Sequence, residues 1–149
     1  MFVAIVMGSS SDAELLTKAE EQLKAFGVDY ETNVLSAHRA PDALVDYVRE
    51  ADARGAAVFI CAAGMAAALP GVVAAHTTKP VIGVPVESGG LGGLDSLLSI
   101  VQMPKGVPVA AVAVNGAQNA ALLAVQIMAI ADADLAKKFA EHKRKLAEA

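Results

Sequence analysis

Short apolar segments alternate along the chain with segments whose apolar residues recur at helical spacing. The first apolar segment, residues 2–7, is apolar at every position, which is typical of a strand buried on both faces. Alternating strands and helices indicate βαβ units, and the pattern predicts strands at 2–7, 28–35, 56–61, 80–86 and 107–114. We therefore predict an α/β fold in three αβα layers around a five-stranded parallel sheet, of flavodoxin-like or Rossmann-like type.

Local signals mark where the helices begin and end. Residues 11–14, Ser-Asp-Ala-Glu, match a capping box, in which a hydroxyl and a carboxylate bond backbone N–H groups at a helix start. The buried face of this helix is expected to begin at Leu15, and Gly27 is expected to end the helix. Pro41 and Pro70 suit the first turns of later helices, where the missing N–H is no loss. The remaining helices are predicted at 94–101, 117–130 and 132–147.

Polar or glycine-rich loops follow four of the predicted strands, at 8–12, 36–42, 62–65 and 87–93. In open parallel sheets, ligands bind beyond the carboxyl ends of the strands, at the point where the strand order reverses. One such loop alone could be a simple turn. Four loops at the same edge of the sheet predict a ligand site.

The loop 36–42, Ser-Ala-His-Arg-Ala-Pro-Asp, carries the strongest chemical signal. The imidazole of His38 can move a proton near pH 7, whereas the guanidinium of Arg39 keeps its charge and presents a fork that fits phosphate oxygens. His38 is therefore a candidate acid/base and Arg39 a candidate anchor. Together they indicate chemistry on a phosphate ester.

The loop after the first strand suits a phosphorylated sugar. Ser9 and Ser11 offer hydroxyls, and the helix start that follows offers unpaired N–H groups with a favourable dipole. Asp12 would repel a phosphate placed against it. We expect its carboxylate to accept hydrogen bonds from ribose hydroxyls, or simply to stabilise the helix start.

Composition and charge narrow the class of protein. A chain of 149 residues suits one domain, residues 1–149. The hydrophobic fraction of 55% with only 4% aromatic residues favours subunit interfaces as well as a core. A net charge of −4 argues against a nucleic-acid partner. The uncharged stretches 55–78 and 107–131 are interrupted by glycine or proline and rich in alanine, which argues against a membrane.

Cysteine and histidine add further expectations. The single cysteine, Cys61, excludes an internal disulfide, fits a reducing compartment and is expected inside a strand. Nothing in the first residues resembles a signal peptide, so a cytoplasmic location is expected. His76 is expected at the surface or in a subunit interface, and His142 is expected at the surface. The sequence has no P-loop, no GxGxxG motif and no Cys/His metal spacing, which predicts a reaction without metal or cofactor on a small-molecule partner.

These motifs resemble those of the N5-carboxyaminoimidazole ribonucleotide mutases of purine biosynthesis, also described as the catalytic component of phosphoribosylaminoimidazole carboxylase. The resemblance spans nearly the whole chain. It rests on Met7-Gly8-Ser9 with Ser11-Asp12, on residues 36–42, on Ala67-Ala68-Leu69-Pro70-Gly71, on residues 80–86, on Leu94-Asp95-Ser96-Leu97 and on Val101-Gln102-Met103-Pro104.

The resemblance implies a flavodoxin-like subunit in a homo-octamer that uses neither ATP nor metal. In this family the carbamate on N5 of the ribonucleotide is lost as CO2 in a closed pocket, and C4 of the aminoimidazole recaptures it. His38 would be the general acid/base, and Ser9, Asp12 and Arg39 would contact the ribose phosphate. The further pocket residues that the resemblance implies are Ser11, Ser36, Ala37, Ala63, Gly64 and Leu69.

One loop departs from the family pattern. Residues 64–71 are Gly-Met-Ala-Ala-Ala-Leu-Pro-Gly, where the family usually has Gly-Gly-Ala-Ala-His-Leu-Pro-Gly. Ala68 therefore stands in place of a second site histidine, and Met65 stands in place of a glycine and is expected to tighten the pocket. His76 lies two helical turns further on, roughly 12 Å along a helix, and is not expected to substitute.

Other classes of protein share this fold and are alternative interpretations. A phosphate-accepting receiver domain needs a carboxylate after strand three and a lysine after strand five, where this chain has residues 62–64 (Ala-Ala-Gly) and Asn115. A flavin-binding module needs aromatic rings to stack on the flavin. This chain has no Trp, and Tyr30 and Tyr47 fall within a predicted strand and a predicted helix. A second class of the same family carboxylates aminoimidazole ribonucleotide directly with CO2. That class typically has an Arg-Ser-Asn arrangement in the loop where this chain has small residues, so the mutase is favoured.

Overall fold

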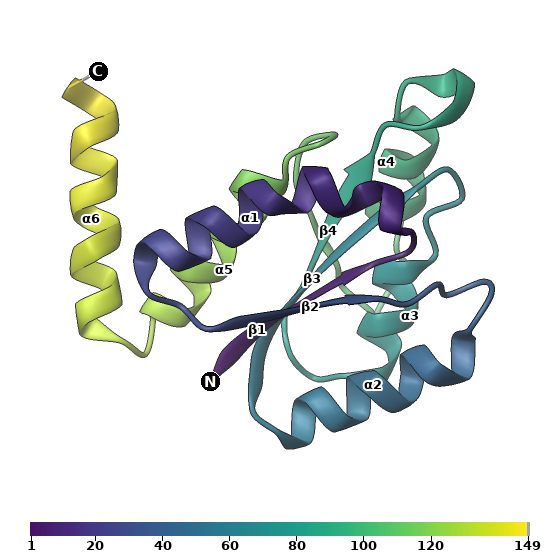
Figure 1. The fold of residues 1–149 in the computed structure, drawn as a ribbon, viewed down its shortest axis with the longest axis horizontal. Coiled ribbons are helices and arrows are strands. Elements are labelled where there is room, and N and C mark those ends of the chain that lie inside the picture. The colour runs from purple at the N-terminus through teal and green to yellow at the C-terminus, as the bar shows by residue number, and fades with distance from the viewer. Residues whose placement is uncertain (149) are drawn as a thin grey trace.

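Five parallel strands form one sheet in the order β2-β1-β3-β4-β5 (Figure 1). The computed structural model describes residues 1–148. Its strands are β1 (Phe2–Met7), β2 (Tyr30–Val34), β3 (Ala56–Gly64), β4 (Val81–Val86) and β5 (Ala110–Ala111), and its helices are α1 (Ala13–Phe26), α2 (Pro41–Ala53), α3 (Leu69–His76), α4 (Leu94–Val101), α5 (Ala117–Ala129) and α6 (Ala133–Glu148), with 3-10 turns η1 (Ser10–Asp12) and η2 (Gly89–Leu91). This strand order is that of flavodoxin-like proteins, and the predicted fold class is confirmed.

Helices cover both faces of the sheet. In β1, Val3, Ile5 and Met7 face the helices α1 and α5, whereas Ala4 and Val6 face α2, α3 and α4. All five side chains are buried, because successive residues of a central strand point to opposite faces and both faces are covered. The three predicted layers are therefore present, with one apolar core on each side of the sheet.

Cys61 lies in the middle of β3 with no exposed surface, as predicted. Burial among apolar neighbours raises the pKa of its thiol, so the side chain remains an uncharged part of the core.

The fifth strand is much shorter than predicted. Only Ala110 and Ala111 pair with β4, although the sequence favoured a strand over 107–114. Proline residues explain why the strand begins later and ends earlier than predicted. Pro108 brings no N–H to the ladder, and Pro85 of β4, whose carbonyl accepts from Asn115 N at 2.8 Å, has no N–H to donate back. The segment after residue 111 therefore leaves the sheet early.

The start of α1 also differs from the prediction. The cap is the hydroxyl of Ser9, which accepts a hydrogen bond from Ser11 N at 3.3 Å and begins η1 one turn before the helix. Asp12, the N-cap of α1 itself, makes no side-chain capping bond, so the predicted capping box is wrong. Leu16 is the fully buried residue of the first turns, and Leu15 only borders the core.

The C-terminal helix α6 stands at one end of the molecule, beyond α1 and α5 (Figure 1). His142 lies on it and is half-buried. Its ring packs 5.5 Å from Phe26 and 5.8 Å from Phe139, and its Nε2 is buried with no hydrogen-bond partner among the described residues. The expectation that His142 lies at the surface therefore holds only in part, because this face of α6 packs against the end of α1. His76 is exposed, as predicted.

Between residues 1 and 148, the longest apolar helices fall short of what a membrane crossing needs.

Gly83 offers a test of how tightly the two layers around β4 pack. A Cβ at this position would collide with the side chain of Ile100 and would lie 3.3 Å from Val109 and 3.4 Å from Pro70. We expect Gly83→Ala to lower the free energy of unfolding by about 1–3 kcal/mol, measured as a lower urea midpoint with unchanged slope. Gly90→Ala, which meets nothing within 4 Å, is the control, and equal midpoints for the two variants would contradict this packing.

Candidate functional site

A cleft of about 570 Å³ opens at the carboxyl ends of β1, β2, β3 and β4. The loops after all four strands contribute to it, as the sequence predicted. It is lined by Gly8, Ser9, Ser11, Asp12, Ser36, Ala37, His38, Arg39, Ala63, Gly64, Met65, Ala66, Ala67, Ala68, Leu69 and Ser88. Every site residue named from the sequence is on this list. Their convergence is therefore a property of the fold.

The loop after β1 presents linked hydroxyl groups. Ser9 adopts an extended backbone (φ −149°, ψ 148°), and its Oγ accepts from both the N–H and the hydroxyl of Ser11, the latter at 2.9 Å. The Ser11 hydroxyl also lies 3.1 Å from Oδ1 of Asp12. These contacts hold three polar side chains in a fixed arrangement at the edge of the cleft, where further acceptors or donors of a ligand can join them.

Asp12 is the charged residue that the fold buries most deeply in this loop, with 9% of its surface exposed. Burial raises the pKa of its carboxyl above the ordinary value of 3.8, and the hydrogen bonds from Ser11 and from the Ser9 backbone oppose that shift only in part. A buried carboxylate that is short of donors is well suited to accept hydrogen bonds from hydroxyl groups of a ligand.

Arg39 joins two of the loops. Its Nη2 donates to the carbonyl of Gly8 at 3.0 Å, and its Nε donates to Oγ of Ser36 at 3.2 Å. None of the ion pairs between described residues involves Arg39, and its side chain is exposed at the cleft. The guanidinium therefore retains unused donors and a full positive charge, which an anion such as phosphate can take up.

His38 sits beside this cation in the turn between β2 and α2. Ser36 closes the turn, because its carbonyl accepts from Ala40 N at 2.9 Å and its hydroxyl from Arg39 N at 3.2 Å. The imidazole is exposed in the single chain. It lines the same cleft as the small-residue loop after β3, so it can reach a ligand held there.

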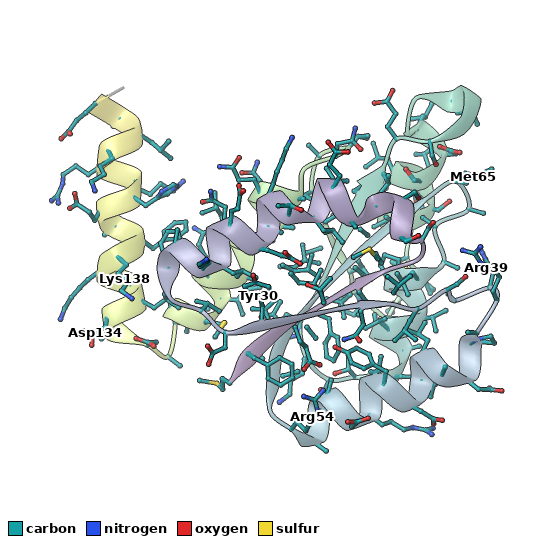
Figure 2. The ribbon with its side chains drawn as sticks, in the orientation of Figure 1. Tyr30, Arg39, Arg54, Met65, Asp134 and Lys138 are labelled. Atoms are coloured by element: carbon teal, nitrogen blue, oxygen red, sulfur yellow. The ribbon has the colours of Figure 1, made fainter. Side chains whose placement is uncertain are left out.

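The loop after β3 is made of small residues apart from Met65. Met65 has φ 54°, in the left-handed region that favours glycine, and 60% of its surface is exposed. This conformation explains why glycine suits the position. Because Met65 is largely exposed and yet lines the cleft, its side chain lies at the rim instead of filling the cleft. Figure 2 shows Met65 and Arg39 at the same end of the molecule. The expectation that Met65 tightens the pocket holds only at its rim.

Ser88, which follows β4, is a cleft residue that sequence reasoning did not single out. The signal was available, because a lone hydroxyl stands between a buried strand and a glycine-rich stretch. Serine is so common in loops that the sequence alone gave no reason to choose it.

Across residues 1–148, no group of three or more His, Cys, Asp or Glu side chains is arranged to hold a metal ion.

The cleft therefore combines a guanidinium, an imidazole and a buried carboxylate with a wall of mostly small, apolar residues. A family model described as AIR carboxylase matches residues 2–149. This chain belongs to the AIR carboxylase family.

Individual relatives of this AIR carboxylase family member support the same family assignment. The N5-carboxyaminoimidazole ribonucleotide mutase of Saccharolobus solfataricus is 57% identical over 145 residues, covering 95% of this chain and 92% of the relative. The enzyme of the same name from Thermotoga maritima is 52% identical over 144 residues, covering 97% and 84%. The crystal structure of Treponema denticola PurE has a TM-score of 0.91 and 32% identity over 99% of this chain and 92% of that one. The resemblance noted in the sequence is confirmed.

The raised pKa of Asp12 predicts a pH-dependent difference in stability. The folded state binds this proton more tightly than the unfolded chain, so the stabilisation is full below pH 3.8 and is lost as pH rises through the folded pKa. Asp12→Asn removes the desolvated charge. We expect the variant to be more stable than the parent at neutral pH and to lose that advantage as pH falls toward 3.8.

Urea midpoints at several pH values measure this difference. Glu14→Gln, an exposed change of the same charge in the first turn of α1, is the control and should shift the midpoint little at any pH. An Asp12→Asn variant that is less stable than the parent at neutral pH would contradict the assignment.

Proposed function

We propose that this chain is an isomerase of purine biosynthesis, which converts N5-carboxyaminoimidazole ribonucleotide into 4-carboxy-5-aminoimidazole ribonucleotide. The observation that carries the proposal is the presence of His38 and Arg39 in one cleft with the small-residue loop after β3, in a chain of the AIR carboxylase family. Relatives that are 57% and 52% identical bear the name of this mutase.

The ribose phosphate binds at the β1 and β2 side of the cleft. Arg39 meets the phosphate with the guanidinium donors that Gly8 and Ser36 leave free, and Ser9 adds a hydroxyl. Asp12 accepts from the ribose hydroxyls, which supplies the donors that its buried carboxylate lacks. Ser11 and Ser36 hold these groups in place.

His38 carries the proton through both halves of the reaction. The bond between N5 and the carbamate carbon breaks, CO2 is released inside the cleft, and His38 donates a proton to the nitrogen. C4 of the electron-rich ring then attacks the CO2, and His38 takes the proton that C4 loses. The histidine ends in its starting state, so the sequence of steps needs no other acid or base.

The CO2 is held at the β3 side of the cleft. Ala37, Ala63, Gly64 and Leu69 line this part, and small side chains allow the backbone to approach the migrating group closely. The absence of a side-chain donor at Ala68 leaves this role to backbone N–H groups, to water or to another residue of the cleft. The loop has no Arg-Ser-Asn arrangement, which favours the mutase over the direct CO2-dependent carboxylase.

We further propose that the site is completed by assembly into a homo-octamer. His38 is exposed in the single chain, yet CO2 has to be retained between the two halves of the reaction. Several large apolar residues around α4 are also exposed: Leu91, Leu94, Leu98 and Val101. An uncovered apolar stripe of this kind is typical of a subunit interface.

Light scattering tests the assembly. We expect a mass of eight times the 15.2 kDa of one chain. Leu98→Glu, which places a charge on the exposed stripe without entering the core of the subunit, should lower that mass. A parent protein that remains a 15.2 kDa species at micromolar concentration would overturn the octamer.

The decisive test of the function is an assay without ATP or metal. Purified protein is given N5-carboxyaminoimidazole ribonucleotide at low bicarbonate, or aminoimidazole ribonucleotide with bicarbonate, and the C4-carboxylated product is followed. We expect rapid conversion of the first substrate. Conversion of only the second would identify the direct carboxylase, and conversion of neither would refute the proposed function.

Two variants separate chemistry from binding in that assay. His38→Asn should reduce turnover by at least about 100-fold while nucleotide binding is retained, because it removes the proton carrier. Arg39→Ala should weaken substrate affinity by about 1.5–3 kcal/mol, the loss for a charge-assisted contact, with a smaller effect on turnover at saturation. Full turnover in the His38→Asn variant would exclude this histidine as the acid/base.

A further inference from the structure

Ser88 is the one cleft residue that the fourth strand contributes. It follows β4 in an extended conformation (φ −153°, ψ 153°) and is the N-cap of η2, yet its side chain makes no capping hydrogen bond. The hydroxyl is half-buried and faces the cleft, so it remains available as a donor to a ligand. The proposed function leaves this donor without a role.

The hydroxyl of Ser88 lies directly against Gly64. A Cβ placed on Gly64 would collide with Oγ of Ser88 and would lie 3.3 Å from Cβ of Ser88 and from the carbonyl oxygen of Val86. Gly64 does not have a positive φ, so its backbone conformation does not require glycine. Its missing side chain instead creates the space that the Ser88 hydroxyl occupies, at the end of β3.

The backbone that leads into Ser88 is fixed by hydrogen bonds at the three residues before it. The carbonyl of Val86 accepts a hydrogen bond of 3.0 Å from the fully buried hydroxyl of Ser96. Glu87 N donates to Oδ1 of Asn115 at 2.9 Å, and Asn115 N donates to the carbonyl of Pro85 at 2.8 Å. A side chain placed by such supports needs little reorganisation to meet a ligand, which is the usual property of a positioning residue.

The composition of this part of the cleft makes Ser88 distinctive. The lining residues from the end of β3 to the start of α3 and from the loop after β4 are Ala63 to Leu69 and Ser88, and Ser88 alone among them has a side-chain hydrogen-bond donor. Arg39 lies toward the other side of the cleft, because its guanidinium is held at the carbonyl of Gly8 next to β1, and β1 and β4, with β3 between them, are about 10 Å apart across the sheet. The donor at the β4 end therefore serves a different part of the ligand from the phosphate.

We propose that Ser88 positions the migrating carboxyl group, donating its hydroxyl hydrogen to an oxygen of the carboxylate or CO2 beside Gly64. The inference rests on the proposed function and assigns Ser88 to the end of the substrate opposite the phosphate. In this chain, where Ala68 offers no donor, Ser88 supplies the side-chain contact to the carboxylate.

The test compares two ligands that differ in the carboxylate alone. Binding of 4-carboxy-5-aminoimidazole ribonucleotide and of aminoimidazole ribonucleotide is measured by calorimetry for the parent and for Ser88→Ala. We expect affinity for the carboxylated ligand to fall about ten-fold or more, the loss for a hydrogen bond to a charged group, with affinity for the other ligand unchanged. Ser99→Ala, which removes an exposed hydroxyl of α4, is the control and should change neither.

A second readout follows the fate of CO2 during turnover. If Ser88 holds the carboxyl group, Ser88→Ala should release a larger fraction of each turnover as aminoimidazole ribonucleotide and free CO2. Equal losses of affinity for the two ligands, or unchanged affinities with unchanged release, would overturn the role of Ser88 while a parent active on N5-carboxyaminoimidazole ribonucleotide keeps the proposed function. A parent that binds neither ligand would overturn both.

Discussion

The parallel pairing of β1 with β3 is the constraint on which the rest of the structure depends. Residue by residue, Val3 pairs with Val58 and Met7 with Ala62, and these side chains have 2% or less of their surface exposed. Because β2 lies outside β1 and β4 outside β3, the chain leaves this central pair in opposite directions. The helix after β1 covers one face and the helix after β3 covers the other, so their loops diverge and leave a cleft between them.

The chemistry of the cleft follows from the side chains that each loop contributes to it. The loop after β1 supplies hydroxyls and one desolvated carboxylate, Asp12. The loop after β2 supplies Arg39, which reaches back to the carbonyl of Gly8 and so fixes His38 beside the first loop. The cleft residues near the ends of β3 and β4 are uncharged, and Ser88 is the polar side chain among them. Charge is thereby concentrated at one end of the site, and the opposite end can hold a small neutral molecule such as CO2.

Much of this arrangement could be predicted from the sequence, because the informative patterns are local. The unbroken apolar runs in β1 and β4 indicate strands that are covered on both faces. The residue types of His38 and Arg39 were enough to predict a ligand site in their loop. Two of the predictions that failed, wholly or in part, depended on contacts between distant segments. The short β5 results from Pro85 on a neighbouring strand, and the partial burial of His142 results from Phe26 on another helix. The capping box failed for a local reason, because Ser9 and not Ser11 provides the cap.

The sequence by itself determined the order of elements, the layers around the sheet and most of the residues that line the cleft, since each depends on periodicity or on a motif within about ten residues. Only the tertiary structure decided that Asp12 loses most of its solvent, that Ser88 lines the cleft, and that its hydroxyl fills the space left by Gly64. The physical reason is that burial and close contact are set by which strands become neighbours. Ser88 and Gly64 are 24 positions apart in the chain and touch only because β3 and β4 pair in register.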